Sequence, residues 1–157
     1  MRNAISDFVR QLAAKIHIDE KLIIKKDGRY FFISSSLRTL THPDFFFAGN
    51  YLGKDHSGRF LPSFSLLKMI ARGEARKIVV DERTEWLFIC GRDIFRRGIK
   101  NVHGSIKEGD LVLVMNRYDE CLGFGRALED LEKPRREVAV KNISDIGDFL
   151  RRERQTH

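Results

Sequence analysis

Residues 111–127 read LVLVMNRYDECLGFGRA, two apolar β-prone runs joined by a short polar turn. Outward from this pair lie more short apolar runs, most of them followed closely by Gly, Asp, Asn or Pro. The strands expected in the second half of the chain are Lys77–Val80, Trp86–Cys90, Leu111–Asn116, Cys121–Ala127 and Glu137–Lys141. Many short strands with close turns are typical of a small β-barrel or sandwich.

Two short helical segments are expected in the same half. Gly91–Gly98 is predicted to form a helical turn with Asp93 near its start, and Ile143–Leu150 a short helix near the end of the chain. Gly123 and Gly125 fall inside a predicted strand, where glycine permits a bulge or the close approach of another backbone. Because no glycine-rich turn into a helix follows them, they do not indicate a nucleotide-binding loop.

The first half of the chain mixes helix and strand. One apolar stripe at helical spacing is formed by Ile5, Phe8, Val9, Leu12, Ala13 and Ile16, and Asp27-Gly28 between two β-prone runs predicts a tight hairpin. The elements expected after it are a helix at Ser35–Thr41, strands at Phe45–Lys54 and Arg59–Pro62, and a helix at Ser63–Arg72 closed by Gly73. We therefore expect an α+β protein of two small domains, an α/β domain over residues 1–75 and a β-barrel over residues 76–157.

The charge balance favours a polyanionic partner. The 157 residues carry 29 Lys+Arg against 22 Asp+Glu, a formal net charge of +7, yet residues 1–75 hold 12 against 7 and residues 76–157 hold 17 against 15. A nucleic-acid site in the second half must therefore come from local clusters of basic residues rather than from net charge. No stretch approaches the ~18 apolar residues of a membrane span, and the first 20 residues lack a signal-peptide core, so we expect a cytoplasmic protein without a membrane partner.

Motifs for metal binding and for catalysis are not evident. The five histidines, His17, His42, His56, His103 and His157, show no ligand-like spacing, and Cys90 and Cys121 lie far apart in predicted strands, where buried packing is expected. The carboxylates Glu129, Asp130 and Glu132 lie in a polar loop and are expected to be solvated. We expect no metal, no cofactor and no catalytic residue.

Basic side chains gather in two places. Arg92, Arg96, Arg97 and Lys100 surround the predicted helical turn, and Arg151, Arg152 and Arg154 lie near the end of the chain. Arginine binds phosphate through a planar fork, so two such clusters brought together predict a groove for single-stranded nucleic acid. The alternative is a surface of ion pairs with Asp93, Asp148 and Glu153.

The order of several motifs resembles a PUA domain, a small β-barrel named for pseudouridine synthases and archaeosine transglycosylases. The matching stretches are Val79-Val80-Asp81-Glu82, Gly91 to Ile99 (GRDIFRRGI), Gly109 to Val114 (GDLVLV) and Leu122 to Ala127 (LGFGRA). The ending, Asp145 to Arg151 (DIGDFLR), resembles the Nip-seven family of large-ribosomal-subunit biogenesis factors, as do Tyr51-Leu52-Gly53-Lys54 and the length. Gly91, Gly98, Arg96 and Arg151 fit that pattern, whereas the other basic residues rest on charge clustering.

The resemblance implies a non-catalytic RNA-binding protein of archaeal or eukaryotic type that acts in large-subunit biogenesis and pre-rRNA processing. RNA would bind through the PUA domain. A further interpretation, compatible with RNA binding, is that ribosome assembly or RNA-processing proteins dock on residues 1–75 through their excess of positive charge and the Phe45–Phe47 run. The alternative to such docking is that these phenylalanines belong to the core. The alternative is a small RNA-modification enzyme with an appended PUA domain, whose active site would lie in the first 75 residues.

Overall fold

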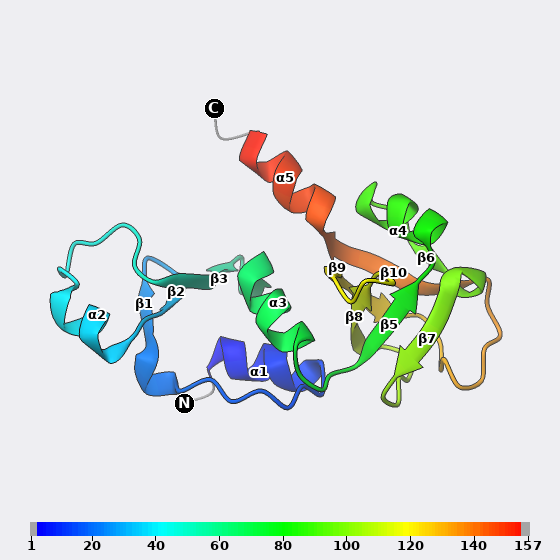
Figure 1. Ribbon diagram of the computed structural model, residues 1–157, viewed down its shortest axis with the longest axis horizontal. Coiled ribbons are helices and arrows are strands. Elements are labelled where there is room, and N and C mark those ends of the chain that lie inside the picture. Colours follow the sequence, from blue (N-terminus) through cyan, green and yellow to red (C-terminus); the bar gives the residue numbers. More distant parts are fainter. Residues whose placement is uncertain (1–2, 155–157) are drawn as a thin grey trace.

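The computed structural model describes residues 3–154, without the side chains of Phe149 and of residues 152–154. Its first half holds a four-stranded antiparallel sheet of order β1-β2-β3-β4 (Figure 1). The elements are α1 (Ala4–Gln11), η1 (Glu20–Leu22), β1 (Ile23–Lys26), β2 (Arg29–Phe32), α2 (Ser35–Leu40), β3 (Asn50–His56), β4 (Arg59–Pro62) and α3 (Phe64–Ala71). The predicted hairpin is confirmed: Asp27 and Gly28 have φ of 50° and 74°, the left-handed region that a tight turn between twisted strands requires.

The two faces of this sheet have different coverings. On the inner face, Tyr30, Leu52 and Phe60 pack with residues of α1 and α3. On the outer face, Phe31 packs with α2 and with the loop that precedes β3. The sheet is therefore the middle layer of the first half, with α1 and α3 between it and the second half (Figure 1).

The second half forms a six-stranded curled sheet of order β6-β10-β9-β8-β5-β7. Its elements are β5 (Lys77–Val80), α4 (Glu82–Ile89), β6 (Ile94–Phe95), η2 (Arg96–Gly98), β7 (Ile99–His103), β8 (Leu111–Met115), β9 (Cys121–Ala127), β10 (Val138–Asp145) and α5 (Ile146–Arg154). All strand pairs are antiparallel except β5 with β8. The two edge strands, β6 and β7, are consecutive in the chain and joined by η2, so the sheet has the shape of a half-barrel.

The strand predicted at Trp86–Cys90 is wrong, because this segment belongs to helix α4. Asp81 caps the helix by accepting a hydrogen bond from the Thr84 N–H, and only Thr84 and Phe88, one turn apart, are buried. Trp86 is 66% exposed. A short apolar run has the same composition in a strand and in a helix, and here the cap and the four-residue spacing decide.

Other boundaries move as well. The strand expected at Phe45–Lys54 begins only at Asn50, because Gly49 turns the chain with φ of 62°. The helical turn expected at Gly91–Gly98 is a 3₁₀ turn only over its last three residues, and β7 after it was not predicted. Strand β10 runs to Asp145, so the last helix starts at Ile146 rather than Ile143.

One hydrophobic cluster joins the two halves of the chain. It contains Leu12 of α1 and Leu66 of α3 together with Leu113 of β8 and Phe124 of β9. The rings of Phe8 and Phe124 meet edge to face, with their centroids 5.3 Å apart. The two sheets are therefore held against each other by a common core. Within residues 3–154, no helix combines the length and the apolar character needed to cross a membrane.

Candidate nucleic-acid interface

Helix α4 is the support on which the predicted basic residues are placed. At its N-terminal end, Gly98 of η2 lies so close that a Cβ on it would overlap Oγ1 of Thr84. The Gly98 carbonyl accepts a hydrogen bond from the Asp81 N–H at 2.9 Å. The hydrogen bond from Thr84 N–H also lowers the pKa of the Asp81 carboxyl from its usual value. The absence of a side chain on Gly98 thus lets η2 pack directly on α4.

The C-terminal end of α4 is packed in the same way against α5. A Cβ on Gly147 would overlap the carbonyl oxygen of Ile89, so only glycine allows this approach. Arg151, one turn further along α5, donates from Nη1 to the same Ile89 carbonyl at 3.4 Å. Its Nη2 also pairs with Oδ1 of Asp145 at 3.5 Å.

Strand β6 connects the two ends along the edge of the sheet. Asn142 of β10 donates its backbone N–H to Oδ1 of Asp93 at 2.9 Å, and its side-chain amide donates to the carbonyls of Phe88 and Arg92. At the other end of β6, the Arg96 N–H donates to the Glu137 carbonyl at 2.8 Å. These bonds leave the outer side of β6 as the free edge of the six-stranded sheet.

The structure places the predicted residues in two groups along this edge. Arg92 and Arg151 lie together at the C-terminal end of α4, with Nη2 of Arg151 3.9 Å from the position of a Cβ on Gly91. Arg96 and Arg97 lie in η2 at the other end of β6, and Lys100 follows in β7, close enough to Asp81 to lower the pKa of that carboxyl. The side chains of Arg152 and Arg154 lie outside the described residues, although the backbone of both belongs to α5.

The alternative was that these cations form ion pairs with nearby carboxylates, and most of the described ones do not. Within residues 3–151, Arg92, Arg96, Arg97 and Lys100 form no ion pair. The Asp93 carboxylate accepts from a backbone N–H instead. Arg151 is paired, but with Asp145. The side chain of Glu153 lies outside the described part.

Two further features of this edge were missed in the sequence. Phe95 of β6 is partly exposed, and the guanidinium of Arg97 lies over its ring, 5.4 Å from the centroid. Arg135 and Arg136 are exposed in the loop before β10, next to the residue that bonds to Arg96. The dipeptide Arg135-Arg136 after Pro134 was the available signal. We call Arg92, Arg96, Arg97, Lys100, Arg151, Arg135, Arg136 and Phe95 the basic strip.

A family model described as the UPF0113 PUA domain matches residues 76–154, the part of the chain that contains the strip. The chain belongs to the UPF0113 PUA domain family. A UPF0113 protein of Archaeoglobus fulgidus is 34% identical over 89 residues, which are 54% of this chain and 51% of the relative. The chain thus spans about half the length of this curated relative.

Solved structures with a PUA domain share the fold over almost the whole chain. A conserved PUA domain protein from Thermoplasma acidophilum superposes with a TM-score of 0.62 at 21% identity, covering 96% of this chain and 93% of that one. A PUA domain from Aeropyrum pernix K1, solved as a tartrate complex, gives 0.63 at 20% identity, covering 96% and 85%. The PUA fold expected from the motifs is confirmed.

One carboxylate of the PUA domain, Glu129, was expected to be solvated and is buried instead. Glu129 is not solvated: only 6% of it is exposed, and its Oε2 accepts hydrogen bonds from the N–H groups of Arg135 and Arg136 at 2.6 and 2.7 Å. Burial raises the pKa of Glu129, but these bonds and the charges of Arg96 and Arg136 outweigh it and leave the pKa below its ordinary value. Asp130 and Glu132 stay at the surface and pair with Lys107.

Replacing Glu129 by glutamine is expected to weaken the PUA domain in a pH-dependent way. Because the folded state lowers this pKa, the ionised group stabilises the fold above its ordinary value of 4.5, and that contribution is lost as the pH falls through the folded pKa. The melting temperature of Glu129→Gln should therefore lie below that of the wild type at neutral pH, and the gap should narrow below pH 4.5. A gap that is constant with pH would contradict this assignment.

The two cysteines differ in their burial. Cys121 is buried, and burial raises the pKa of its thiol to about 11. Cys90 is exposed at the end of α4, so its expected burial in a strand is wrong. Among the described residues, no three His, Cys, Asp or Glu side chains are grouped as metal ligands, and His157 lies outside that part.

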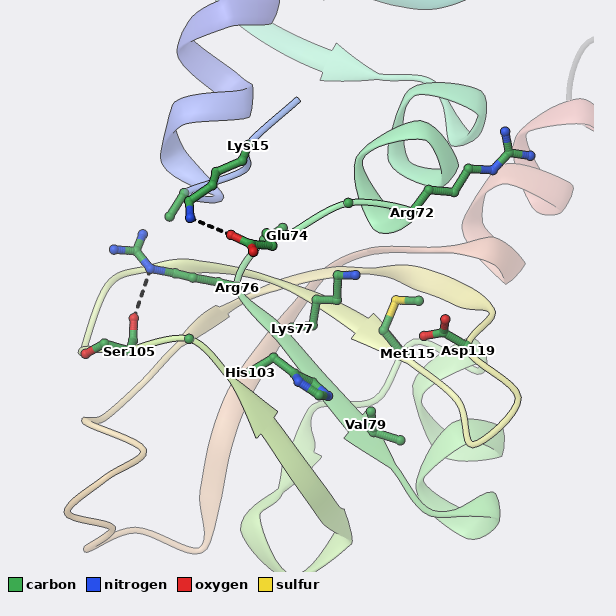
Figure 2. Close-up of a pocket in the computed structure, with 14 residues that line it drawn as sticks. Lys15, Arg72, Glu74, Arg76, Lys77, Val79, His103, Ser105, Met115 and Asp119 are labelled. Atoms are coloured by element: carbon green, nitrogen blue, oxygen red, sulfur yellow. Dashed lines mark hydrogen bonds and ion pairs between the residues drawn. The ribbon is translucent and has the colours of Figure 1, made fainter. Parts of the chain in front are cut away.

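A cavity of about 760 Å³ lies between the PUA domain and the first half of the chain (Figure 2). Most of its charged side chains are engaged: Lys15 pairs with Glu74, Arg76 donates to the Ser105 carbonyl at 3.0 Å and pairs with Asp110, and Lys77 donates to the Ala71 carbonyl. Arg72 points away from the cavity in Figure 2. Two of these cations also bond across the boundary between the halves, Lys77 to Ala71 and Arg76 to the Gln11 carbonyl at 3.1 Å.

Proposed function

We propose that the basic strip of the PUA domain binds single-stranded RNA. The observation that carries this proposal is that Arg92, Arg96, Arg97 and Lys100, all near one sheet edge, form no ion pair within residues 3–151. Cations without a carboxylate at ion-pair distance keep their hydrogen-bond donors available to phosphates, although Lys100 and Arg96 also interact at longer range with Asp81 and Glu129. Membership of a PUA domain family supports the same function.

The geometry of the strip suits an extended strand. Its cations follow β6 from the C-terminal end of α4 to β7, so successive phosphates can be met along one edge. Phe95 under the Arg97 guanidinium adds a flat surface on which a base can stack. These contacts are to phosphates and ring faces, so binding should depend little on base sequence.

We further propose that the protein acts without catalysis in large-subunit biogenesis and pre-rRNA processing in the cytoplasm. The support is that the Asp145–Arg151 stretch, which includes Gly147, resembles the Nip-seven family. In this chain Gly147 and Arg151 hold α5 against α4. Assembly or processing proteins would be the protein partners.

The proposal is tested by titrating the full chain against a single-stranded ribosomal RNA fragment at several salt concentrations. If Arg92, Arg96, Arg97, Lys100 and Arg151 each neutralise a phosphate, log K should fall against log salt with a slope of about −3.5. The RNA recovered afterwards should be unchanged in mass. Absence of binding at low salt, or binding independent of salt, would overturn RNA binding by the strip, and a modified RNA would overturn the non-catalytic role.

A further inference from the structure

The outward strand positions of the first sheet hold four lysine and arginine side chains and one histidine. Cross-strand pairing aligns Lys26 with Arg29 and Arg29 with Lys54, and next to them His56 with Arg59. Directly paired residues point to the same side of a sheet, so these five side chains share the outer face. None of the outward positions on β1 to β4 holds a carboxylate.

Three acidic residues lie near these strands. Asp44 is exposed in the loop that precedes β3, next to Pro43, whose carbonyl accepts a hydrogen bond from Lys26 at 2.9 Å. Asp55 points to the inner face, where it accepts hydrogen bonds from Lys25 and Tyr30 at 2.7 and 2.9 Å. Asp27, in the hairpin turn, forms an ion pair with Arg29 at 4.0 Å. Lys54 and Arg59 form no ion pair within residues 3–151. The outward strand positions are thus cationic, and the carboxylates nearest to them, Asp27 and Asp44, lie in the adjoining turn and loop.

Two exposed phenylalanines lie over this cationic face. Phe46 is 79% exposed, and the guanidinium of Arg29 lies 4.6 Å from its ring centroid, with Phe31 on the other side at 5.6 Å. Phe47 is 58% exposed and meets the rings of Phe31 and Tyr51 at 5.3 and 6.4 Å. Each ring is positioned by a contact on one side and remains accessible on the other.

Cations beside accessible aromatic rings match the chemistry of a single nucleic-acid strand. Phosphates neutralise the charges, and unpaired bases stack on the rings and on the arginine plane. An acidic protein segment would satisfy the charges but leave the rings without flat partners. We propose that the outer face, formed by Lys26, Arg29, Lys54, His56 and Arg59 with Phe46 and Phe47, is a second contact surface for single-stranded RNA. This inference rests on the proposed RNA binding.

The second surface is separate from the basic strip. Helices α1 and α3 cover the opposite side of the first sheet and pack toward the second half, whereas the strip lies beyond them at α4 and β6 (Figure 1). Changes on the outer face therefore leave the strip intact. An RNA that touches both surfaces must pass from one end of the molecule to the other.

The aromatic part of the proposal is tested with Phe46→Ala in the full chain, using fluorescence anisotropy and a single-stranded RNA of about 30 nucleotides, longer than one typical binding site. Loss of one stacked base should weaken binding about five-fold or more. The matched control is Tyr118→Ala, since Tyr118 is 67% exposed and lies 4.7 Å from the Arg117 guanidinium, away from the first sheet. The control should bind as the wild type does.

The cationic part is tested with the double variant Lys54→Glu/Arg59→Glu. Its control, Arg10→Glu/Lys68→Glu, makes the same change in net charge on α1 and α3. The outer-face variant should lose about ten-fold in affinity and the control much less, because only the first removes phosphate contacts. Ultraviolet crosslinking of wild type should place nucleotide on the tryptic peptide of residues 39–54, which contains Phe46 and Phe47.

The outcomes separate this inference from the proposed function. If the wild type binds no RNA, both are overturned. If the wild type binds RNA but Phe46→Ala and Lys54→Glu/Arg59→Glu bind equally well, and no crosslink falls in residues 39–54, the outer face is not an RNA surface. RNA binding by the strip would then stand, and the outer face would be assigned to a protein partner.

Discussion

The Gly123→Ala variant is expected to lose about 4 kcal/mol of folding free energy. Gly123 lies in β9 between β8 and β10, with φ of 146°, a conformation that L-residues with a side chain rarely adopt. A Cβ here would overlap the Ser144 carbonyl oxygen and lie 2.8 Å from Cα of Asp145. Both neighbours are backbone atoms of a paired strand, so neither can move without disturbing the sheet. Urea unfolding followed by circular dichroism measures the loss.

Gly109→Ala separates the two causes. Gly109 also has a positive φ, of 88°, but no atom lies within 4 Å of its Cβ position. Its replacement should cost only the backbone strain, about 1 kcal/mol. If the two variants were equally stable, the close approach of β10 to Gly123 would not be a determinant of the fold.

The double variant Arg92→Glu/Arg97→Glu is expected to reduce RNA affinity about 100-fold at low salt, since two charge-assisted contacts of about 1.5 kcal/mol each are lost. Both side chains are exposed, lie at opposite ends of β6, and form no ion pair among the described residues, so folding should persist. The slope of log K against log salt should become less steep by about 1.4, because two phosphates are no longer neutralised. Anisotropy titrations at several salt concentrations measure both quantities.

Arg10→Glu/Lys68→Glu again provides a control of equal net charge. A comparable loss of affinity in that control would show that overall charge, rather than the strip, governs binding. Melting temperatures of both double variants verify that the comparison is between folded proteins. The effect should appear with RNAs of different sequence, because the strip offers contacts to phosphates.

Much of the fold was predictable where local chemistry and tertiary packing agree. The Asp27-Gly28 turn, the glycine at position 123 and the apolar strands at 111–115 and 121–127 all carry signals that act within a few residues. Asn3 caps α1 by accepting a hydrogen bond from the Ile5 N–H. The PUA fold was expected from the order of the motifs at residues 79–82, 91–99, 109–114 and 122–127.

The errors come from contacts between distant segments. The run at residues 86–90 is apolar enough for a strand, but Thr84 must meet Gly98 and Phe88 must face the core, which requires a helix. Glu129 looks solvated in a polar loop, yet the N–H groups of Arg135 and Arg136 fold back to it. Such partners are separated by 6 to 14 positions, so no local pattern reveals them.

The candidate site, too, was predictable where the signal is local and not where it depends on tertiary contacts. Clustering in the sequence located the cations, but it gave no account of why Gly98 and Gly147 accompany them. The structure supplies that reason, because each glycine lets a segment bearing arginine pack directly on α4. The cationic outer face of the first sheet was hidden, since its members are spread from Lys26 to Arg59 and meet only through strand pairing.

The hydrophobic cluster common to both sheets has a consequence for any long ligand. Because Phe8 packs on Phe124 and Leu12 and Leu66 lie in one core with Leu113, no flexible linker separates the two halves. The distance from the outer face to β6 is therefore fixed. An RNA strand long enough to reach both surfaces would gain affinity from the second attachment at little entropic cost. A shorter strand would gain no affinity from it.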